Sequence, residues 1–313
     1  NPKKPISVPA NMLMPNATAS LFDFMVSANV NVNNLKLWSQ QWTETVYTDE
    51  ANYDLVTRNS NGRAWNTLYA SVIRDLKEAK KAIALDASLT DAGRKTQMAT
   101  CDVMEVYAFH VLVDLFGNVP YSQAMQEGNE LPVYDDAATI YKDLLARLAT
   151  ASNNLVGDNE FGIADLIYGG DAAQWKKFAN SLRLRLAIRL ADSDAAAAKT
   201  AAEAAIAAGV FASSSDNFTL NYLDAPPNTN PIWEDLVQSN RNDFVAANTL
   251  VDYLNTLNDP RGLKFFEVAP SGNLLGGTYG AASSYGTYSH INTAITNPTM
   301  PGTSSVPARI FLS

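Results

Sequence analysis

The apolar residues of one segment recur at the spacing of an α-helix, and this periodicity limits the possible folds more than any other feature. Between residues 65 and 83, apolar side chains lie three and four positions apart, which places them on one face of a helix. These residues are Trp65, Leu68, Tyr69, Val72, Ile73, Leu76, Ala79 and Ile83. Such a face must be buried, so the chain needs further elements to cover it.

Further segments with helical periodicity follow, and short loops separate most of them. We predict helices over about 17–33, 91–116, 136–155, 171–190, 194–208 and 243–257. Gly117 is placed to end the second of these, and Pro120 prevents its continuation. Successive helix pairs joined by short loops are typical of stacked hairpins. The sequence therefore predicts an all-α fold of tetratricopeptide-like stacked helical hairpins, although the 34-residue signature of that repeat is absent.

The irregular segments predict how the chain is organised. Residues 1–16 contain four prolines and no period, so we expect an extended N-terminal arm. Over residues 17–313 we expect a single domain, with a helical-hairpin core at about 65–209 and a loop-rich part at about 34–64 and 210–313. Irregular stretches this long are usually functional or disordered, and we expect these to be ligand-side loops. The apolar ending at 309–313 predicts that a C-terminal part of the fold is missing.

Composition and motifs exclude several classes of function. The net charge is −9 and no basic stripe is present, so we expect no nucleic-acid partner. The single cysteine, Cys101, excludes an internal disulfide framework. Because the two histidines, His110 and His290, are far apart in sequence, we expect no metal site. Phosphate-binding loops and dinucleotide fingerprints are absent from the sequence, so we expect no cofactor.

Carboxylates bear on enzymatic function because glycoside hydrolases use two of them. Asp49, Glu50 and Asp54 lie in an aromatic-rich loop and are the candidates for such a role. Nothing in their spacing distinguishes them from surface charge or from a calcium-binding group. We therefore expect no enzymatic activity and no catalytic residue, and we keep hydrolysis as the least favoured alternative.

Aromatic side chains in the irregular segments favour carbohydrate binding. Sugars present apolar C–H faces and a rim of hydroxyls, which proteins meet with aromatic rings and with amides or carboxylates. Trp38 and Trp42 also have the spacing of one helical face, so a core position is an equal alternative for them. The candidate glycan-binding residues are Trp38, Gln41, Trp42, Tyr47, Tyr53, Tyr279, Tyr285 and Tyr288.

Four segments, in order, resemble the signatures of SusD-like proteins (the SusD/RagB superfamily). The first is the helix end at 114–124, DLFGNVPYSQA. The second is the helix entry at 132–141, PVYDDAATIY, and the third is the helix at 169–185, GGDAAQWKKFANSLRLR. The fourth is the turn Asp259-Pro260-Arg261. Each is weak alone, but their order over residues 114–261 identifies the chain as a member of this family.

The resemblance implies a function and a location. It implies a lipoprotein on the outer surface of a Bacteroidota-type cell, held at the outer membrane by an N-terminal lipid anchor that is absent from this chain. It also implies a partner, a SusC-like TonB-dependent transporter, to which the protein delivers captured glycan without catalysis. Family members are longer than this chain. Their ligand contacts follow no fixed motif, but the loops corresponding to 36–56 and 270–292 usually face the ligand.

Two alternatives to glycan capture stay open besides hydrolysis. The same fold could carry peptide cargo, which the sequence does not distinguish from glycan. The chain could instead be a purely scaffolding helical-repeat protein, with a broad protein-binding surface and no small ligand.

Overall fold

A computed structural model describes residues 8–56, 59–292 and 308–311, with the backbone alone for the last four. The chain divides into two compact units. Unit 1 is formed by residues 1–21, 65–220 and 309–313, and unit 2 by residues 22–64 and 221–308. The division falls within two helices, α1 and α3. The predicted single domain over 17–313 stays a prediction.

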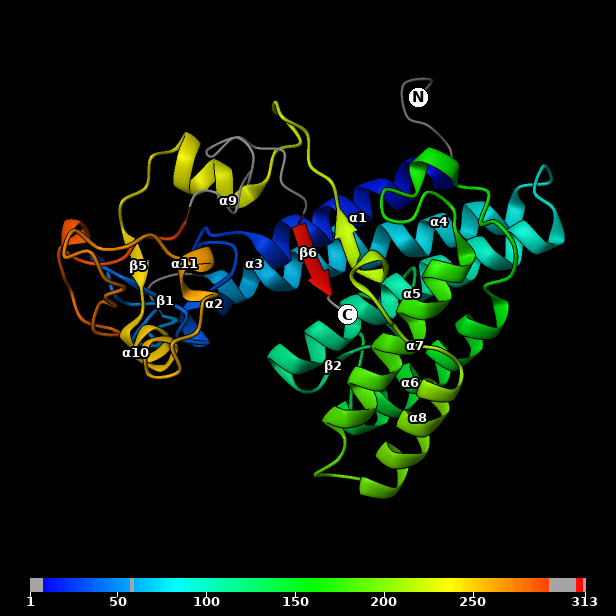
Figure 1. Cartoon of the computed structure of the whole chain (residues 1–313). Helices are drawn as coiled ribbons and strands as arrows, with labels where there is room; N and C mark the ends of the chain where they lie inside the picture. The colour runs from blue at the N-terminus through cyan, green and yellow to red at the C-terminus, as the bar shows by residue number, and fades with distance from the viewer. Residues whose placement is uncertain (1–7, 57–58, 293–307, 312–313) are drawn as a thin grey trace. The chain divides into compact units, whose positions relative to one another are not determined.

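Unit 1 is built from long helices that pack in sequence order. They are α4 (Arg74–Leu85), α5 (Asp91–Phe116), α6 (Ala137–Asn154), α7 (Ala172–Arg189) and α8 (Ala195–Ala207). Each packs against the next, as Figure 1 shows for the cyan-to-green part of the chain. In the sequence, α3 (Ser60–Asn66) and a π-helical turn (Thr67–Ile73) directly precede α4, so the periodic segment at 65–83 is helical throughout. The chain is all-α in class, with stacked helical hairpins as predicted.

Side-chain and glycine caps explain where these helices begin and end. The Asp136 carboxylate accepts from Thr139 N, and that of Asp171 accepts from Ala173 N and Gln174 N. Gly117 ends α5 with φ 73°, and its N–H donates to the Val113 carbonyl. The predicted boundaries at these three residues are confirmed.

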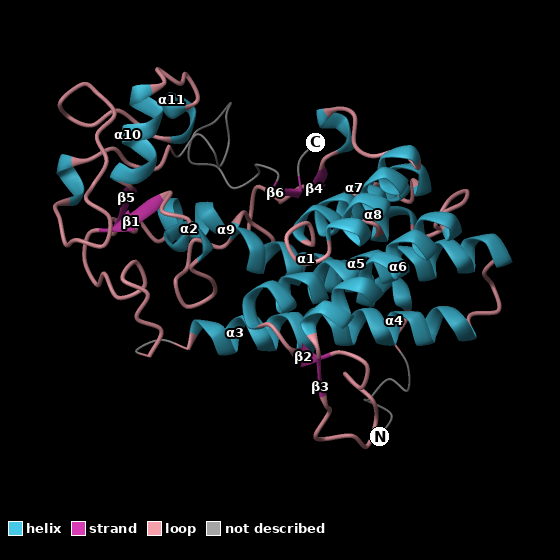
Figure 2. Ribbon diagram, turned by 90° about the horizontal axis from the view of Figure 1, so that it is seen from below, coloured by secondary structure: helices cyan, strands magenta, loops and turns pink. Residues whose placement is uncertain are grey.

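The core of unit 1 is aromatic where α5 and α7 meet the strand after α8. Trp175, Tyr107 and Phe178 are at most 1% exposed. Phe218 of β4 (Phe218–Leu220) stacks on Phe178 with ring centroids 4.0 Å apart and nearly parallel rings. β4 pairs with β6 (Ala308–Phe311), and β2 (Val119–Pro120) pairs with β3 (Tyr134–Asp135). Figure 2 shows how little strand the fold contains.

The prediction of an extended arm over 1–16 is wrong for residues 10–16. They belong to α1 (Ala10–Val26), which starts where the Pro9 carbonyl accepts from Met12 N and Leu13 N. Pro15 lies inside this helix, but its missing N–H affects only the carbonyl of Asn11, which is exposed to water near the helix start. Residues 1–7 lie outside the described part of the chain.

The same helix ends seven residues before the predicted end at residue 33. After Val26, short polar side chains bond to nearby backbone N–H groups: Ser27 Oγ accepts from Asn29 N, and Asn29 Oδ1 accepts from Asn31 N. These local bonds compete with the helical ladder and turn the chain.

Unit 2 has short elements joined by long loops. Its described elements include α2 (Leu35–Trp38), β1 (Trp42–Glu44), α9 (Pro231–Trp233), a π-helical turn (Glu234–Gln238), β5 (Phe244–Ala246), α10 (Asn248–Thr256) and α11 (Gly262–Phe265). β1 and β5 form an antiparallel pair in which Trp42 faces Ala246 and Glu44 faces Phe244.

This pairing corrects two expectations. The helix predicted over 243–257 starts only at Asn248, because residues 244–246 pair with β1 instead. Trp38 and Trp42 do not share a helical face either, since α2 ends at Trp38 and Trp42 begins β1. Both differences come from the pairing of β1 with β5, two strands about 200 residues apart in sequence. Local periodicity carries no information on such a distant contact.

Candidate functional site

A turn between α2 and β1 organises the predicted site residues of unit 2. Gln40 has φ 55°, a left-handed conformation that reverses the chain after α2. Its carbonyl accepts from Thr249 Oγ1 at 2.9 Å, and the carbonyl of Gln41 accepts from Ala247 N at 3.1 Å. The turn is therefore fixed against the start of α10, with Gln41 beside a pocket and Gln40 beside a pair of predicted tyrosines.

A pocket of about 430 Å³ lies beside Gln41 and Trp42. Its opposite wall comes from α10 and from the segment after it. Two of the lining rings are open to solvent: Tyr253 is 62% exposed and Phe265 44% exposed. The full lining is Gln41, Trp42, Leu250, Tyr253, Leu254, Asp259, Arg261, Phe265, Phe266 and Ile291. Aromatic faces and polar groups thus occupy the same small space.

The polar side of the pocket is an ion pair between Arg261 and Asp259. Arg261 Nε lies 3.0 Å from both carboxylate oxygens of Asp259, and the second guanidinium contact comes from Nη2. The pairing lowers the pKa of Asp259 and raises that of Arg261. Both groups therefore stay charged near neutral pH, and together they add no net charge to the pocket. They offer fixed donors and acceptors to a polar ligand.

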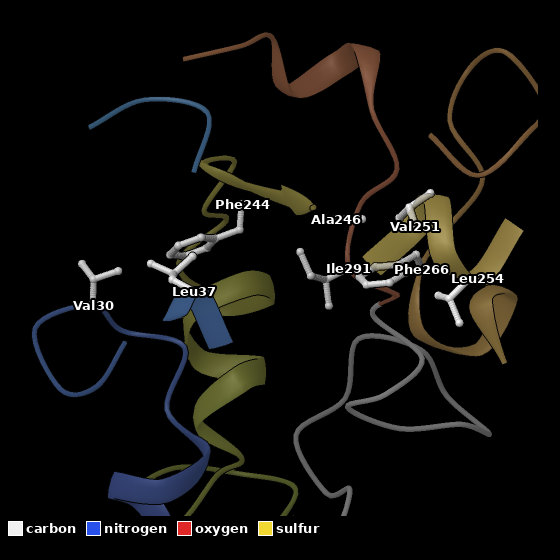
Figure 3. Close-up of a cluster of buried hydrophobic side chains, with 8 residues drawn as sticks. All are labelled: Val30, Leu37, Phe244, Ala246, Val251, Leu254, Phe266 and Ile291. Atoms are coloured by element: carbon white, nitrogen blue, oxygen red, sulfur yellow. The ribbon is translucent and has the colours of Figure 1, made fainter. Parts of the chain in front are cut away.

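A buried apolar cluster supports this pocket from within unit 2. Figure 3 shows its eight residues. They are Val30, Leu37, Phe244, Ala246, Val251, Leu254, Phe266 and Ile291. Trp42 packs against Phe244 with ring centroids 5.8 Å apart, so its ring is half-buried with one side fixed by the core. The pocket rings consequently need little ordering when a ligand arrives.

The second candidate surface is the tyrosine pair, formed by the predicted residues Tyr53 and Tyr279. Their ring centroids are 6.5 Å apart, and Gln40 Nε2 lies 3.5 Å from the Tyr53 hydroxyl. The Tyr279 hydroxyl donates to the Leu37 carbonyl at 2.8 Å. Burial raises the pKa of Tyr279, and the bond from Gln40 lowers that of Tyr53. Tyr279 is half-buried and fixed, whereas Tyr53 is 53% exposed and free to meet a ligand.

Hydrogen bonds join the two loops that carry these tyrosines. Asn52 Nδ2 donates to the Gly280 carbonyl at 2.8 Å, and Ser283 N donates to the Thr45 carbonyl at 2.9 Å. Gly280 N donates to Thr43 Oγ1 at 3.1 Å. These bonds fix the loops at 45–53 and 277–283 against each other, and with them the positions of Tyr53 and Tyr279.

The remaining predicted residues have other surroundings. Tyr285 stacks on His290, with ring centroids 3.8 Å apart and an interplanar angle of 10°, so one face of its ring is covered. Tyr288 follows a 3₁₀ turn (Tyr285–Thr287) and is half-buried. Tyr47 is 72% exposed with φ 57°. Trp38 is half-buried, and its carbonyl lies 3.5 Å from the Tyr53 hydroxyl.

The structure thus brings the predicted residues together only in part. Gln41 and Trp42 share the pocket, and Trp38 lies beside the tyrosine pair of Tyr53 and Tyr279. Sequence reasoning missed the other eight lining residues, among them Tyr253, Phe265 and Arg261. Arg261 belongs to a turn that was read only as a family marker, and no local signal separated Tyr253 from other exposed helix residues.

A family model described as SusD-like, starch-binding associating with outer membrane, matches residues 2–311. The chain is a SusD-like protein. The family predicted from the four motif segments is therefore confirmed. A search of the curated proteins gives no match.

Solved structures share the fold of this SusD-like protein. A chitin-binding protein has a TM-score of 0.79 and 22% identity, with 97% of this chain and 67% of that chain covered. A chitin-binding SusD homolog from Flavobacterium johnsoniae has a TM-score of 0.74 and 23% identity, with 96% and 63% covered. A SusD/RagB family protein from Bacteroides thetaiotaomicron VPI-5482 has a TM-score of 0.76 and 22% identity, with 98% and 65% covered. The chain thus spans about two thirds of their length.

No described helix of this SusD-like protein is long and apolar enough to cross a membrane. Within the same residues, no group of three or more His, Cys, Asp or Glu side chains is arranged to hold a metal ion.

Proposed function

We propose that this SusD-like protein captures glycans through the Trp42 pocket and the tyrosine pair of unit 2, with the Trp42 pocket as the principal site. The pocket carries the proposal because it combines half-exposed rings with a fixed Asp–Arg pair, the two kinds of surface that a sugar ring requires. The family description as starch-binding and the chitin-binding of two similar structures support the same ligand class.

The arrangement of the pocket favours binding over catalysis. A glycoside hydrolase needs two carboxyl groups on either side of the scissile bond. Among the described residues that line the pocket, Asp259 is the only carboxylate. Its pKa is lowered by Arg261, which opposes a role as general acid. Of the three carboxylates considered from sequence, Glu50 is 1% exposed and none lines the pocket.

A matched pair of tyrosine variants tests the proposal. Tyr253→Ala removes a 62% exposed ring from the pocket, and the control Tyr134→Ala removes a 64% exposed ring from unit 1. Binding of chitohexaose and maltoheptaose would be measured by isothermal titration calorimetry. We expect Tyr253→Ala to weaken binding by about 1–2 kcal/mol, or roughly fivefold to thirtyfold. Equal affinities of the two variants would argue against the pocket.

We further propose that the protein works at the cell surface, lipid-anchored in the outer membrane, and passes its glycan to a SusC-like TonB-dependent transporter. The printed family description, which associates the family with the outer membrane, supports the location. Tethering beside a transporter would make a weak single-site affinity effective by raising the local concentration. Affinity purification of the tagged protein from its native membranes tests this, and recovery without a large outer-membrane barrel would count against it.

A further inference from the structure

Unit 1 contains a second and larger cavity, which lies wholly within that unit. It measures about 990 Å³. Its floor follows one stripe of α5, and its sides come from α4 and α6, which pack on either side of α5. Figure 2 shows these three helices side by side. The segment 121–127 after β2 closes one end. We call this cavity the α5 cleft.

Four charged groups form a closed network on the floor of the α5 cleft. Lys80 Nζ lies 3.1 Å from Asp102 Oδ1 and 2.9 Å from Glu105 Oε1. The Arg147 guanidinium bonds to the same two carboxylates, with Nε 3.2 Å from Asp102 Oδ2 and Nη2 2.7 Å from Glu105 Oε2. Glu105 is 2% exposed. Two cations thus neutralise two anions where the helices meet, and only Glu105 among them is fully buried.

A network of this kind stabilises a helical unit poorly. Removing charges from water costs several kcal/mol per ion, and apolar side chains of similar volume pack helices equally well. The adjacent interfaces of unit 1 use such side chains, for example Leu144, Leu148 and Val106, which are at most 1% exposed. A charged network in which Glu105 is buried and its three partners are 20–23% exposed beneath an open cleft is instead typical of a site that holds polar groups in fixed positions.

The network fixes a ring and a hydroxyl that face the cleft. Arg147 Nη1 donates to the Tyr121 hydroxyl at 2.9 Å, and that hydroxyl donates to the Asp143 carboxylate. The Arg147 guanidinium lies over the Tyr121 ring, 5.8 Å from its centroid. Phe109 meets the same ring edge-on at 4.7 Å. Tyr121 therefore presents a half-exposed and immobilised ring next to a carboxylate.

The charge balance of the lining selects a class of ligand. The cations are Lys77, Lys80, Lys81 and Arg147, and the anions are Asp102, Glu105, Glu127 and Asp143, so their formal sum is zero. A phosphate or polyanionic ligand would find no excess of positive charge. A neutral ligand with many hydroxyls can use both donors and acceptors, and its apolar faces can meet Tyr121, Met98 and the 41% exposed Met125.

We infer that the α5 cleft is a second glycan-binding site, specific for neutral oligosaccharides and independent of the Trp42 pocket. Two sites on one chain would hold a polysaccharide by repeated engagement, with an avidity above either single affinity. The inference goes beyond the proposed capture site because it assigns binding to the helical-hairpin unit.

A bulky variant tests the cleft without disturbing its network. Ala84→Trp places an indole at the exposed Ala84 position, which lines the cleft on α4. The control Leu85→Trp changes the next residue, which is 85% exposed and outside the cleft. Both would be made in a Trp42→Ala background, where the first site is weakened. Binding of chitohexaose, maltoheptaose and cellohexaose would be followed by isothermal titration calorimetry and by hydrogen exchange of residues 121–127.

We expect the Trp42→Ala protein to bind at least one of these three glycans with protection of residues 121–127. Ala84→Trp should abolish this binding, and Leu85→Trp should retain it. Absence of binding by all three glycans in the Trp42→Ala background would overturn the inference, whatever the wild-type protein binds at its first site. Equal binding by both tryptophan variants would also overturn it, as would binding of an extended peptide in place of the glycans. If the wild-type protein binds no glycan, the proposed function fails separately.

Discussion

Asp165 provides the sharpest test of how the family motif at 169–185 stabilises unit 1. Its side chain is buried, at 3% exposure, just before the glycine pair that precedes α7. Its two oxygens accept hydrogen bonds from the following donors: Trp175 Nε1 at 2.6 Å, Gly170 N at 2.9 Å, Asn159 Nδ2 at 3.0 Å, Ile167 N at 3.1 Å and Tyr168 N at 3.2 Å. One carboxylate thus satisfies a loop and the first turn of a helix.

The structure allows the cost of its removal to be worked out. A hydrogen bond to a charged group contributes about 1.5–3 kcal/mol, but neighbouring bonds do not add fully, because water and loop movement compensate in part. Trp175 is 0% exposed, so its indole N–H would stay unsatisfied. We therefore expect Asp165→Ala to lower the free energy of unfolding by about 3–5 kcal/mol.

Asp165→Asn separates charge from shape. Oδ2 accepts from Trp175, Gly170 and Asn159, and an amide oxygen in its place would keep these three bonds. The amide NH₂ would then face two backbone N–H groups, so we expect a smaller loss of about 2 kcal/mol. Asp192→Ala, at an exposed carboxylate after α7, is the control and should change stability by less than about 0.5 kcal/mol. Urea unfolding followed by circular dichroism measures all three. A loss below about 1 kcal/mol for Asp165→Ala would refute the reasoning.

Three further changes have defined outcomes. Burial, together with Arg189 and Arg185, lowers the pKa of His110 to about 3. Between about pH 6.5 and pH 3 only the unfolded state then binds the proton, so the free energy of unfolding should fall by roughly 2 kcal/mol from about pH 7 to about pH 5. In the His110→Gln variant, stability measured by urea unfolding should depend less on pH over this range. Gly117→Ala should cost about 1–3 kcal/mol in thermal unfolding. The added Cβ would meet no atom within 4 Å, so the cost comes from the backbone φ of 73° alone. Gly286→Ala, where φ is not positive and space is also open, should be near neutral. Tyr279→Phe should cost about 0.5–1.5 kcal/mol in the same assay because the Leu37 carbonyl loses one of its two donors and keeps only Gln40 N.

The helical part of the fold could be predicted because its signals are local. Asp136, Asp171 and Gly117 each cap a helix through contacts within four residues. The motif at 169–185 was recognisable, but its physical basis was not. Asp165 lies outside the matched letters, and its bond to the indole of Trp175 depends on how the loop folds back.

The candidate site was less predictable because its residues come from distant segments. Trp42 faces Ala246 across a strand pair, and Arg261 shares the pocket with Trp42 although more than 200 residues separate them in sequence. Aromatic composition alone identified Trp42 and Tyr53. It also selected Tyr285, whose ring is covered on one face by His290. Exposure and partners, which decide whether a ring can meet a sugar, are properties of the folded chain.

A crystal structure of the protein soaked with chitohexaose or maltoheptaose would test the central claim most directly. Glycan capture by the Trp42 pocket predicts a sugar ring stacked between Trp42 and Tyr253, with its hydroxyls bonded to Asp259 and Arg261. An intact oligosaccharide in that position would support binding without catalysis. A glycan bound only outside the Trp42 pocket and the tyrosine pair, or an empty pocket at saturating ligand, would contradict the account.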